Sequence, residues 1–255
     1  MKEQIIRMEE LAINAFPAIL TELYDGWILR FSNGYTYRAN SINPLYTSMI
    51  NIEEKIKYCE QKYVHLGLPV VYKLAEPIHD DLDQILDKHN YKILKQADIM
   101  SCSISQDKFS KTDMVDISTK MTEDWLNGFL SLNGTTDRLK QQTAKTMLSN
   151  IKNPIICASI NEDNKMIGCG LGVLEDKKIG LFDICIHENY RRKRYGTLIC
   201  KAIMNESKKY QAKSGYLQVA SENDAAKNLY QSMGFTKDYT YWYRVKEINS
   251  HTYLK

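Results

Sequence analysis

Long apolar runs are missing from this chain of 255 residues. No stretch of about 18 consecutive apolar residues occurs, so the sequence predicts no transmembrane helix. The first residues, Met1 to Gln4, lack the features of a secretory signal peptide. The excess of one sign of charge is also small. A formal net charge of +3 does not by itself indicate a nucleic-acid partner. These absences predict a cytoplasmic protein that binds neither a membrane nor nucleic acid.

Clustered metal ligands and paired cysteines are absent as well. The six cysteines are scattered without a C-x-x-C pair, and no two of the five histidines stand at i and i+4 beside a carboxylate. In a reducing compartment such cysteines are typically small buried hydrophobic residues. We therefore expect neither disulfides nor a metal site. The length exceeds one typical domain, so two domains are expected.

Two common nucleotide-binding motifs are missing, but a basic loop is present. Neither G-x-x-x-x-G-K-[ST] nor G-x-G-x-x-G occurs. Instead, an apolar stretch at 181–186 leads into four consecutive cations at 191–194, then a glycine and a helical pattern from Leu198. A strand that becomes a helix through such a loop presents unpaired N–H groups at the positive end of the helix dipole, which is a site for phosphate or pyrophosphate. The alternative is a solvated helix start whose cations serve solubility.

The residues in and after this loop resemble the GNAT acyltransferase superfamily. Its signature, Arg/Gln-x-x-Gly-x-Gly/Ala, matches with Arg191 and Gly196 in the outer positions, while Arg194 replaces the inner glycine. Further matching segments follow in order at 215–219, at Asn223, at 225–230 and at 233–235. The resemblance implies a GNAT fold and acetyl-CoA as the acyl donor, with no metal. It also implies an amine acceptor, which could be a small molecule, an amino acid or a peptide.

The resemblance also assigns roles to individual residues. Backbone groups of the strand before the loop would pair with the pantetheine arm, the loop would hold the pyrophosphate, and Asn223 would contact the pantetheine. The expected cofactor-binding residues are Ile184, Cys185, Ile186, Arg191, Arg192, Lys193, Arg194, Tyr195, Gly196, Thr197 and Asn223. Tyr230 would protonate the leaving thiolate, and Asp183 is the expected general base.

Each of these roles has an alternative. Tyr230 could be an aromatic core residue with a hydrogen-bonded hydroxyl, and Asn223 could cap the helix that follows it, alone or in addition. Strand alternation could point Asp183 away from the cofactor, which leaves Glu222 or a water relay as the base. Arginine resists the positive φ that a glycine would permit, so we expect the loop at Arg194 to stay in ordinary backbone space and its guanidinium to add to phosphate binding. The alternative is that Arg194 weakens the affinity for the cofactor.

The second half of the chain has elements in the GNAT order, β-α-α-β-β-β-α-β-α-β. Strand patterns occupy 113–117, 154–160, 166–174, 179–186, 216–220 and 235–245, and helix patterns occupy 122–132, 136–148, 198 to about 213, and 224–233. This order predicts an α/β fold with a mixed sheet that splays where the cofactor enters.

The first half reads as a degenerate copy of the same plan. A hairpin is expected from strands at 27–31 and 35–39, followed by a helix at 52–66, a strand at 67–74, a helix at 82–89 and a turn and strand from 90. An unrelated α+β domain is the alternative. We expect a GNAT-like domain at 1–108 that shapes the substrate site, a catalytic domain at 109–255, and a linker at 105–111.

The leading hypothesis is an acetyl-CoA-dependent N-acetyltransferase. A coenzyme A-binding sensor or interaction module without turnover is the alternative, and an acceptor other than an amine is a third option. Arg30, Arg38 and Arg138 stand in segments expected to meet the acceptor and could bind an acidic group on it. The surface is the more common place for arginine, however, and is expected for all three.

Overall fold

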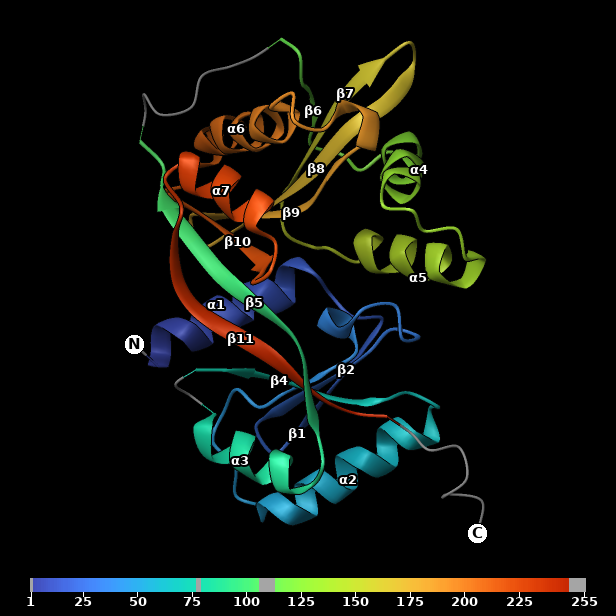
Figure 1. The fold of residues 1–255 in the computed structure, drawn as a ribbon, viewed down its shortest axis with the longest axis vertical. Helices are drawn as coiled ribbons and strands as arrows, with labels where there is room; N and C mark the ends of the chain where they lie inside the picture. The colour runs from blue at the N-terminus through green and yellow to red at the C-terminus, as the bar shows by residue number, and fades with distance from the viewer. Residues whose placement is uncertain (1, 77–78, 106–112, 248–255) are drawn as a thin grey trace.

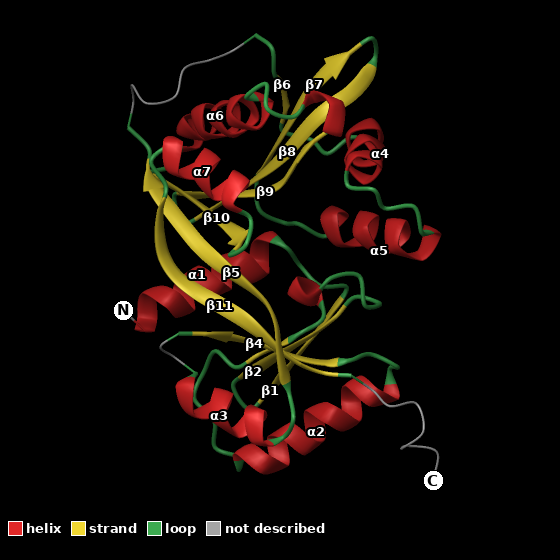
Figure 2. Cartoon of the chain, in the orientation of Figure 1, coloured by secondary structure: helices red, strands yellow, loops and turns green. Residues whose placement is uncertain are grey.

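The computed structural model describes residues 2–76, 79–105 and 113–247, which build one mixed sheet of eleven strands with helices on both faces (Figures 1 and 2). The strand order is β1-β2-β3-β4-β11-β5-β10-β9-β8-β7-β6. The strands are β1 (Leu20–Tyr24), β2 (Trp27–Phe31), β3 (Ile42–Asn43), β4 (Val70–Ala75), β5 (Lys92–Ser103), β6 (Asp116–Ser118), β7 (Ile155–Glu162), β8 (Lys165–Glu175), β9 (Lys178–Ile186), β10 (Ser214–Ala220) and β11 (Thr236–Lys246). The α-helices are α1 (Lys2–Ala15), α2 (Ile52–His65), α3 (Asp80–Lys88), α4 (Glu123–Leu132), α5 (Arg138–Ser149), α6 (Tyr195–Ser207) and α7 (Asp224–Ser232).

The two halves of the sheet exchange their last strands. In the first half α2, β4, α3 and β5 follow one another, just as α6, β10, α7 and β11 do in the second. β11 pairs antiparallel with β4 and β5, and β5 pairs antiparallel with β11 and β10. Each half therefore lends its final strand to the other, and β5 and β11 run side by side through the middle of the molecule (Figure 1). The repeated order expected from the sequence is confirmed, and the sheet is continuous across it.

Apolar side chains alternate between the two faces of this sheet, as a strand period of two requires. In the second half, Leu181 and Leu217 pack against α6, whereas Phe182 and Tyr216 pack with α4 and α5 on the opposite face. In the first half, α2 and α3 cover the face of Leu74, and α1 covers the face of Val71. We call the side that carries α1, α4 and α5 the α1 face.

The elements expected in the second half are all present, with shifted ends. Thr122 caps α4 by accepting a hydrogen bond from the Trp125 N–H at 3.1 Å, as its place before the helix predicts. α6 begins three residues earlier than its apolar pattern, at Tyr195, and ends at Ser207 with a 3₁₀ turn after it. The mixed α/β fold class is confirmed.

The hairpin expected at 27–31 and 35–39 is wrong. β2 pairs instead with β1, through the two-residue turn Asp25-Gly26, in which both residues have positive φ (42° and 82°). That geometry matches the right-handed twist of a hairpin. The segment at 37–39 is a 3₁₀ turn, η1 (Tyr37–Ala39), because the Asn40 side chain accepts the Ser32 and Gly34 N–H groups and bends the chain locally. Two segments of turn-forming residues lie close together here, and the predicted hairpin was centred on the wrong one. Neither β1 nor α1 was predicted from the sequence.

Most of the linker expected at 105–111, including the domain boundary at 108/109, lies outside the described residues. The division into two domains at that point stays a prediction. None of the helices in the described ranges has the length and apolar content that crossing a bilayer requires.

Candidate active site

Strands β9 and β10 diverge partway along their length. They pair in parallel only as far as Leu181 and Leu217. Beyond these residues β9 remains paired with β8 as far as Ile186, and β10 remains paired with β5 as far as Ala220. The facing backbone edges are therefore unpaired where the strands diverge, and a ligand with an extended amide chain can hydrogen-bond to such an edge. We call this opening the splay.

The free edge of β9 carries the strand residues expected to bind the cofactor. Ile184 and Ile186 turn their side chains toward α6, and half-buried Cys185 turns toward the α1 face. The backbone groups of Ile184 and Ile186 face the splay, whereas those of Cys185 face β8. The His187 N–H donates to the Ile167 carbonyl, and the pair of Cys185 and Cys169 follows in the same register, so backbone groups alternate between the two edges of β9. Ile184 and Ile186 thus have backbone groups on the edge of β9 that faces the splay, and Cys185 lies between them.

A bulge in β9 decides where Asp183 points. Asp183 and Ile184 together oppose Gly170 of β8, and Asp183 has a left-handed backbone with φ of 52°. Regular alternation would send Asp183 toward α6 together with Leu181. The extra residue instead leaves it on the α1 face. The bulge interrupts the regular alternation, so Asp183 lies on the α1 face of the sheet, and its role as the base stays a prediction.

The Asp183 carboxylate is buried and only partly paired. Its side chain is 8% exposed, its Oδ1 lies 3.8 Å from an Arg38 guanidinium nitrogen, and its Oδ2 has no hydrogen-bond partner. Burial raises the pKa of Asp183 above its ordinary value, because desolvation disfavours the charged form, and the Arg38 cation opposes this rise. A carboxylate with a raised pKa is a stronger base than an exposed aspartate.

The basic loop ends in a helix start that can bind an anion. The first-turn N–H groups of α6, from Tyr195 onward, have no partner within the helix, and the side chain of the N-cap residue, Arg194, does not cap them. Gly196 is buried at this point: a Cβ there would lie 3.1 Å from the Leu229 side chain and 3.9 Å from that of Ile186. Helix α6, helix α7 and the end of β9 meet closely at Gly196. Thr197 follows it in the first turn.

The conformation expected for the loop is wrong at Arg194. This residue has φ of 64° and Arg192 has φ of 65°, so both adopt the left-handed conformation. For a residue with a Cβ this costs roughly 1–2 kcal/mol. The position that is glycine in the GNAT signature thus keeps the backbone that glycine favours, although arginine occupies it.

The loop cations differ in what they touch. Arg191 donates from Nε to the Ile186 carbonyl at 3.2 Å, which ties the loop back to the end of β9. The Lys193 ammonium lies 4.9 Å from the centre of the Tyr190 ring. The side chains of Arg192, Lys193 and Arg194 are exposed beside the start of α6, so three cations stand free to add to an anion site there.

Helix α7 supplies the two remaining expected residues. Asn223 caps it by accepting the Ala226 N–H at 3.1 Å, which confirms the capping role. Tyr230 lies near Cys185 and Cys200, with its ring centroid 6.0 Å from that of Phe235. Burial raises its pKa well above the ordinary value, so the hydroxyl keeps its proton at neutral pH. Glu222, the alternative base, is exposed in the turn before α7.

The first half adds residues that sequence reasoning did not place. Arg38 of η1 reaches Asp183, and burial together with the Asp183 charge raises the pKa of Tyr35. Arg30 is buried, contrary to the surface position expected for it, whereas Arg138 is exposed as expected. Nothing in the local pattern around 30–38 signals these contacts, because they cross between the halves of the chain.

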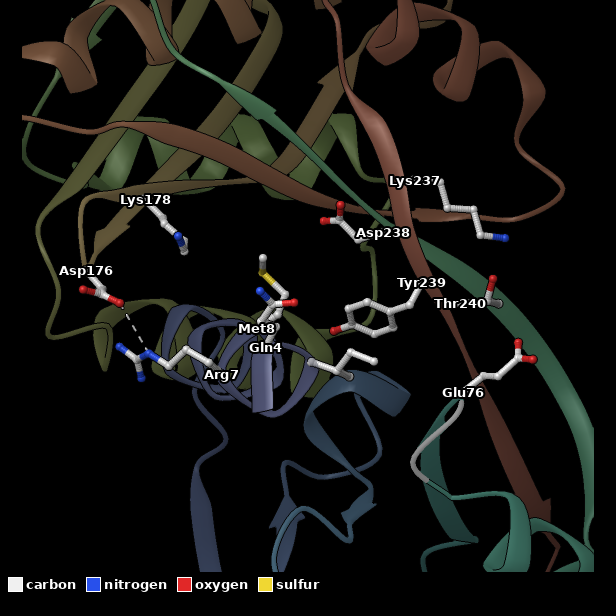
Figure 3. A pocket seen from close by; sticks show the side chains of 11 residues that line it. Gln4, Arg7, Met8, Glu76, Asp176, Lys178, Lys237, Asp238, Tyr239 and Thr240 are labelled. Atoms are coloured by element: carbon white, nitrogen blue, oxygen red, sulfur yellow. Dashed lines mark ion pairs between the residues drawn. The ribbon is translucent and has the colours of Figure 1, made fainter. Parts of the chain in front are cut away.

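A separate hollow lies elsewhere on the α1 face (Figure 3). It measures about 950 Å³ and lies between α1, the beginning of β11 and the β8–β9 turn, where Arg7 and Asp176 form an ion pair at 3.5 Å. Lys178, on its rim, begins β9, whereas the splay opens at the other end of that strand. Among the described residues, no three His, Cys, Asp or Glu side chains gather as a metal site would require.

Comparison with known proteins finds acetyltransferases that match most of the chain. Residues 3–244 match the family model described as "Probable histone acetyltransferase Rv0428c C-terminal". The chain is 25% identical over 249 residues to the uncharacterized N-acetyltransferase YobR of Bacillus subtilis (strain 168), covering 96% of this chain and 99% of YobR. Among solved structures, a GCN5-related N-acetyltransferase from Kribbella flavida has a TM-score of 0.69 at 10% identity, covering 96% of each chain. A tandem GNAT protein from the clavulanic acid biosynthesis pathway has a TM-score of 0.64 at 8% identity, covering 94% of this chain and 87% of its own.

Replacing Arg194 by glycine should make the protein more stable. Glycine takes the left-handed backbone without a steric cost, so the Arg194→Gly variant should gain about 1 kcal/mol in the free energy of unfolding, measured by urea titration. Arg194→Ala is the control, because it removes the same charge but keeps a Cβ, and it should stay within about 0.5 kcal/mol of the parent. Equal stability of the two variants would contradict the left-handed backbone at this residue.

Proposed function

Since this chain belongs to the "Probable histone acetyltransferase Rv0428c C-terminal" family, and with it to the GNAT superfamily, we propose that it transfers the acetyl group of acetyl-CoA to an amine. The observation that carries the proposal is the splay between β9 and β10, which opens beside the N-terminus of α6. A free strand edge and a basic helix start stand next to each other there. These are the two features that a long amide-containing arm with a pyrophosphate requires.

The residues present suit such a donor. Gly196 leaves the first turn of α6 open at a point where a Cβ would crowd Leu229 and where the first N–H groups lack partners. These N–H groups and the exposed cations of 192–194 would hold the pyrophosphate, with charge-assisted contacts. The backbone of Ile184 and Ile186 would pair with the pantetheine arm, and Cys185 lies between them on the same strand. The Nδ2 of Asn223 remains to contact the same arm, since capping uses its Oδ1.

The chemistry then needs a base on one side of the splay and an acid on the other. In the proposed reaction the acceptor ammonium gives a proton to the Asp183 carboxylate, and the resulting amine attacks the thioester carbonyl. The N–C bond forms, the C–S bond breaks, and Tyr230 donates its proton to the departing sulfur. The attacking nitrogen sheds its second proton as the amide forms, and this proton returns to the Tyr230 oxygen. The environments of the two residues support these roles, because burial makes Asp183 a better base and keeps Tyr230 protonated.

Binding of the donor is the first measurement. At about 100 times its dissociation constant, acetyl-CoA should add about 2.7 kcal/mol to the free energy of unfolding, which raises the melting temperature. S-acetylpantetheine lacks the pyrophosphate and should shift the melting temperature less, because it leaves the start of α6 unengaged. Release of free thiol in the presence of an amine would then show transfer. Absence of any shift with acetyl-CoA would overturn the proposal.

A Tyr230 variant discriminates between an enzyme and a non-catalytic coenzyme A sensor of the same fold. The sensor is the alternative because arginine occupies position 194, where the GNAT signature has glycine. The Tyr230→Phe variant should lose about 100-fold or more in kcat while its acetyl-CoA affinity stays the same, because only proton donation is removed. Tyr210→Phe, at an exposed tyrosine after α6, is the matched control and should keep the parent kcat. If no amine gives thiol release from the parent although acetyl-CoA binds, the sensor is the better description.

The pH dependence tests Asp183. With Asp183 as base, kcat/KM should rise with unit slope at pH values below the raised pKa of Asp183 and level off above that pKa, since the acceptor arrives as an ammonium ion. In Asp183→Asn the protein can no longer take this proton, so kcat/KM should fall and should rise with unit slope up to the pKa of the acceptor amine itself. A parent profile that already has this second shape would exclude Asp183 as the base.

A further inference from the structure

A group of buried charges lies where the first half of the chain meets β9 on the α1 face. Arg30 is 3% exposed and donates to the carbonyl oxygens of Phe16 and Arg38. Burial lowers the pKa of Arg30 to about 10, which leaves it charged at neutral pH. Because it holds the backbone of both residues, Arg30 sets the position of Phe16 and of Arg38 relative to each other.

The Arg38 guanidinium is held in place by its neighbours, but it makes no hydrogen bond to a described residue. It lies 4.3 Å from the centre of the Phe16 ring and 3.8 Å from Asp183, and its side chain is 31% exposed. Within the described residues it has no hydrogen-bond acceptor, so the five N–H donors of its planar fork remain available. Nearby, the Asp183 Oδ2 and the Thr36 hydroxyl are buried without partners.

The balance of charge at this junction favours an anion. Three cations, Arg30, Arg38 and Lys73, lie near two carboxylates, Glu9 and Asp183. Glu9 is already occupied, since it binds the Lys73 ammonium and accepts the Tyr239 hydroxyl at 2.8 Å. The surplus positive charge is therefore unpaired in a region of low dielectric, where an added negative charge is attracted strongly.

We propose, on the basis of the proposed function, that the acceptor is an amine that also carries a carboxylate, as an amino acid does. Its carboxylate binds the Arg38 fork, and its ammonium group lies against Asp183. Arg38 and Asp183 are only 3.8 Å apart, which matches a ligand whose own opposite charges are neighbours. A new ion pair to each of them replaces their long contact with each other.

A carboxylate fits this position better than a phosphate. A guanidinium binds a carboxylate through two parallel hydrogen bonds, and one such pair neutralises a single charge. A phosphate dianion would require a second cation within reach. Of the other two cations at the junction, however, Arg30 is 3% exposed and Lys73 is 6% exposed, and both are occupied by protein groups. Arg38 is thus the junction cation that a ligand can touch.

The test compares each common amino acid with its C-terminal amide as acceptor, at saturating acetyl-CoA, by thiol release. The amide keeps the amine and the side chain but loses the negative charge. At least one acid should exceed its amide by about ten- to a hundredfold in kcat/KM, the range expected for hydrogen bonds to a charged group. In Arg38→Gln this ratio should fall to about one, and Arg38→Lys, which keeps the charge without the fork, should retain part of it.

A control variant tests whether the effect is specific to Arg38. Arg138→Gln removes an exposed arginine at the start of α5 and should leave the ratio of acid to amide as in the parent. Equal rates with acids and amides throughout, or an equal loss with both in Arg38→Gln, would overturn the proposal. The melting temperature of each variant without ligand shows whether it folds.

Binding distinguishes failure of this inference from failure of the proposed function. If no acceptor releases thiol, transfer is excluded, and the melting temperature of the protein with coenzyme A is measured with each amino acid and each amide. A shift with an acid that is absent with its amide and lost in Arg38→Gln supports the carboxylate site on its own. No such difference overturns it.

Discussion

The interruption of parallel pairing between β9 and β10 is the constraint on which the rest of the molecule depends. Unpaired backbone groups are costly inside a protein unless a ligand or water satisfies them. Two strands can diverge without losing their order only if each is held firmly on its other edge. β8 holds β9 as far as Ile186, and β5 holds β10 as far as Ala220. The opening is thus built into the sheet before any ligand arrives, which reduces the cost of ordering on binding.

The strand exchange makes the first half necessary to the second. β5 belongs to the first half by sequence, yet it is the strand that keeps β10 in place beside the splay. The described part of the first half has no basic glycine loop at the matching point, where the two-residue strand β3 is followed by Pro44. In return it supplies Arg38, held by Arg30, to the α1 face of β9. One half thus suits a donor, and the junction of both halves suits an acceptor.

The charges of the donor region and of the acceptor region also differ in their exposure to water and salt. The loop cations at 192–194 are exposed, so salt and water screen them, and they suit a large and highly charged cofactor. Asp183 is buried and Arg38 beside it is only partly exposed, so screening there is weaker and one ion pair discriminates more strongly between ligands. The left-handed arginines of the loop add a local strain that a glycine at position 194 would remove. Their retention adds cations near the helix start.

The sequence by itself determined what depends on neighbours along the chain. The order of elements, the cap at Thr122, the strand-to-helix passage through the basic loop before α6 and the placing of Tyr230 on α7 all follow from local period and composition, and the fold agrees with them. Tertiary structure alone decided the bulge at Asp183, the partner of β2, the exchange of β5 with β11 and the meeting of Arg38 with Asp183. These features arise from pairing and packing between segments far apart in the chain, where the winning arrangement is the one that buries most apolar surface and satisfies most backbone groups together. A local sequence pattern does not show which of these long-range arrangements is the most stable.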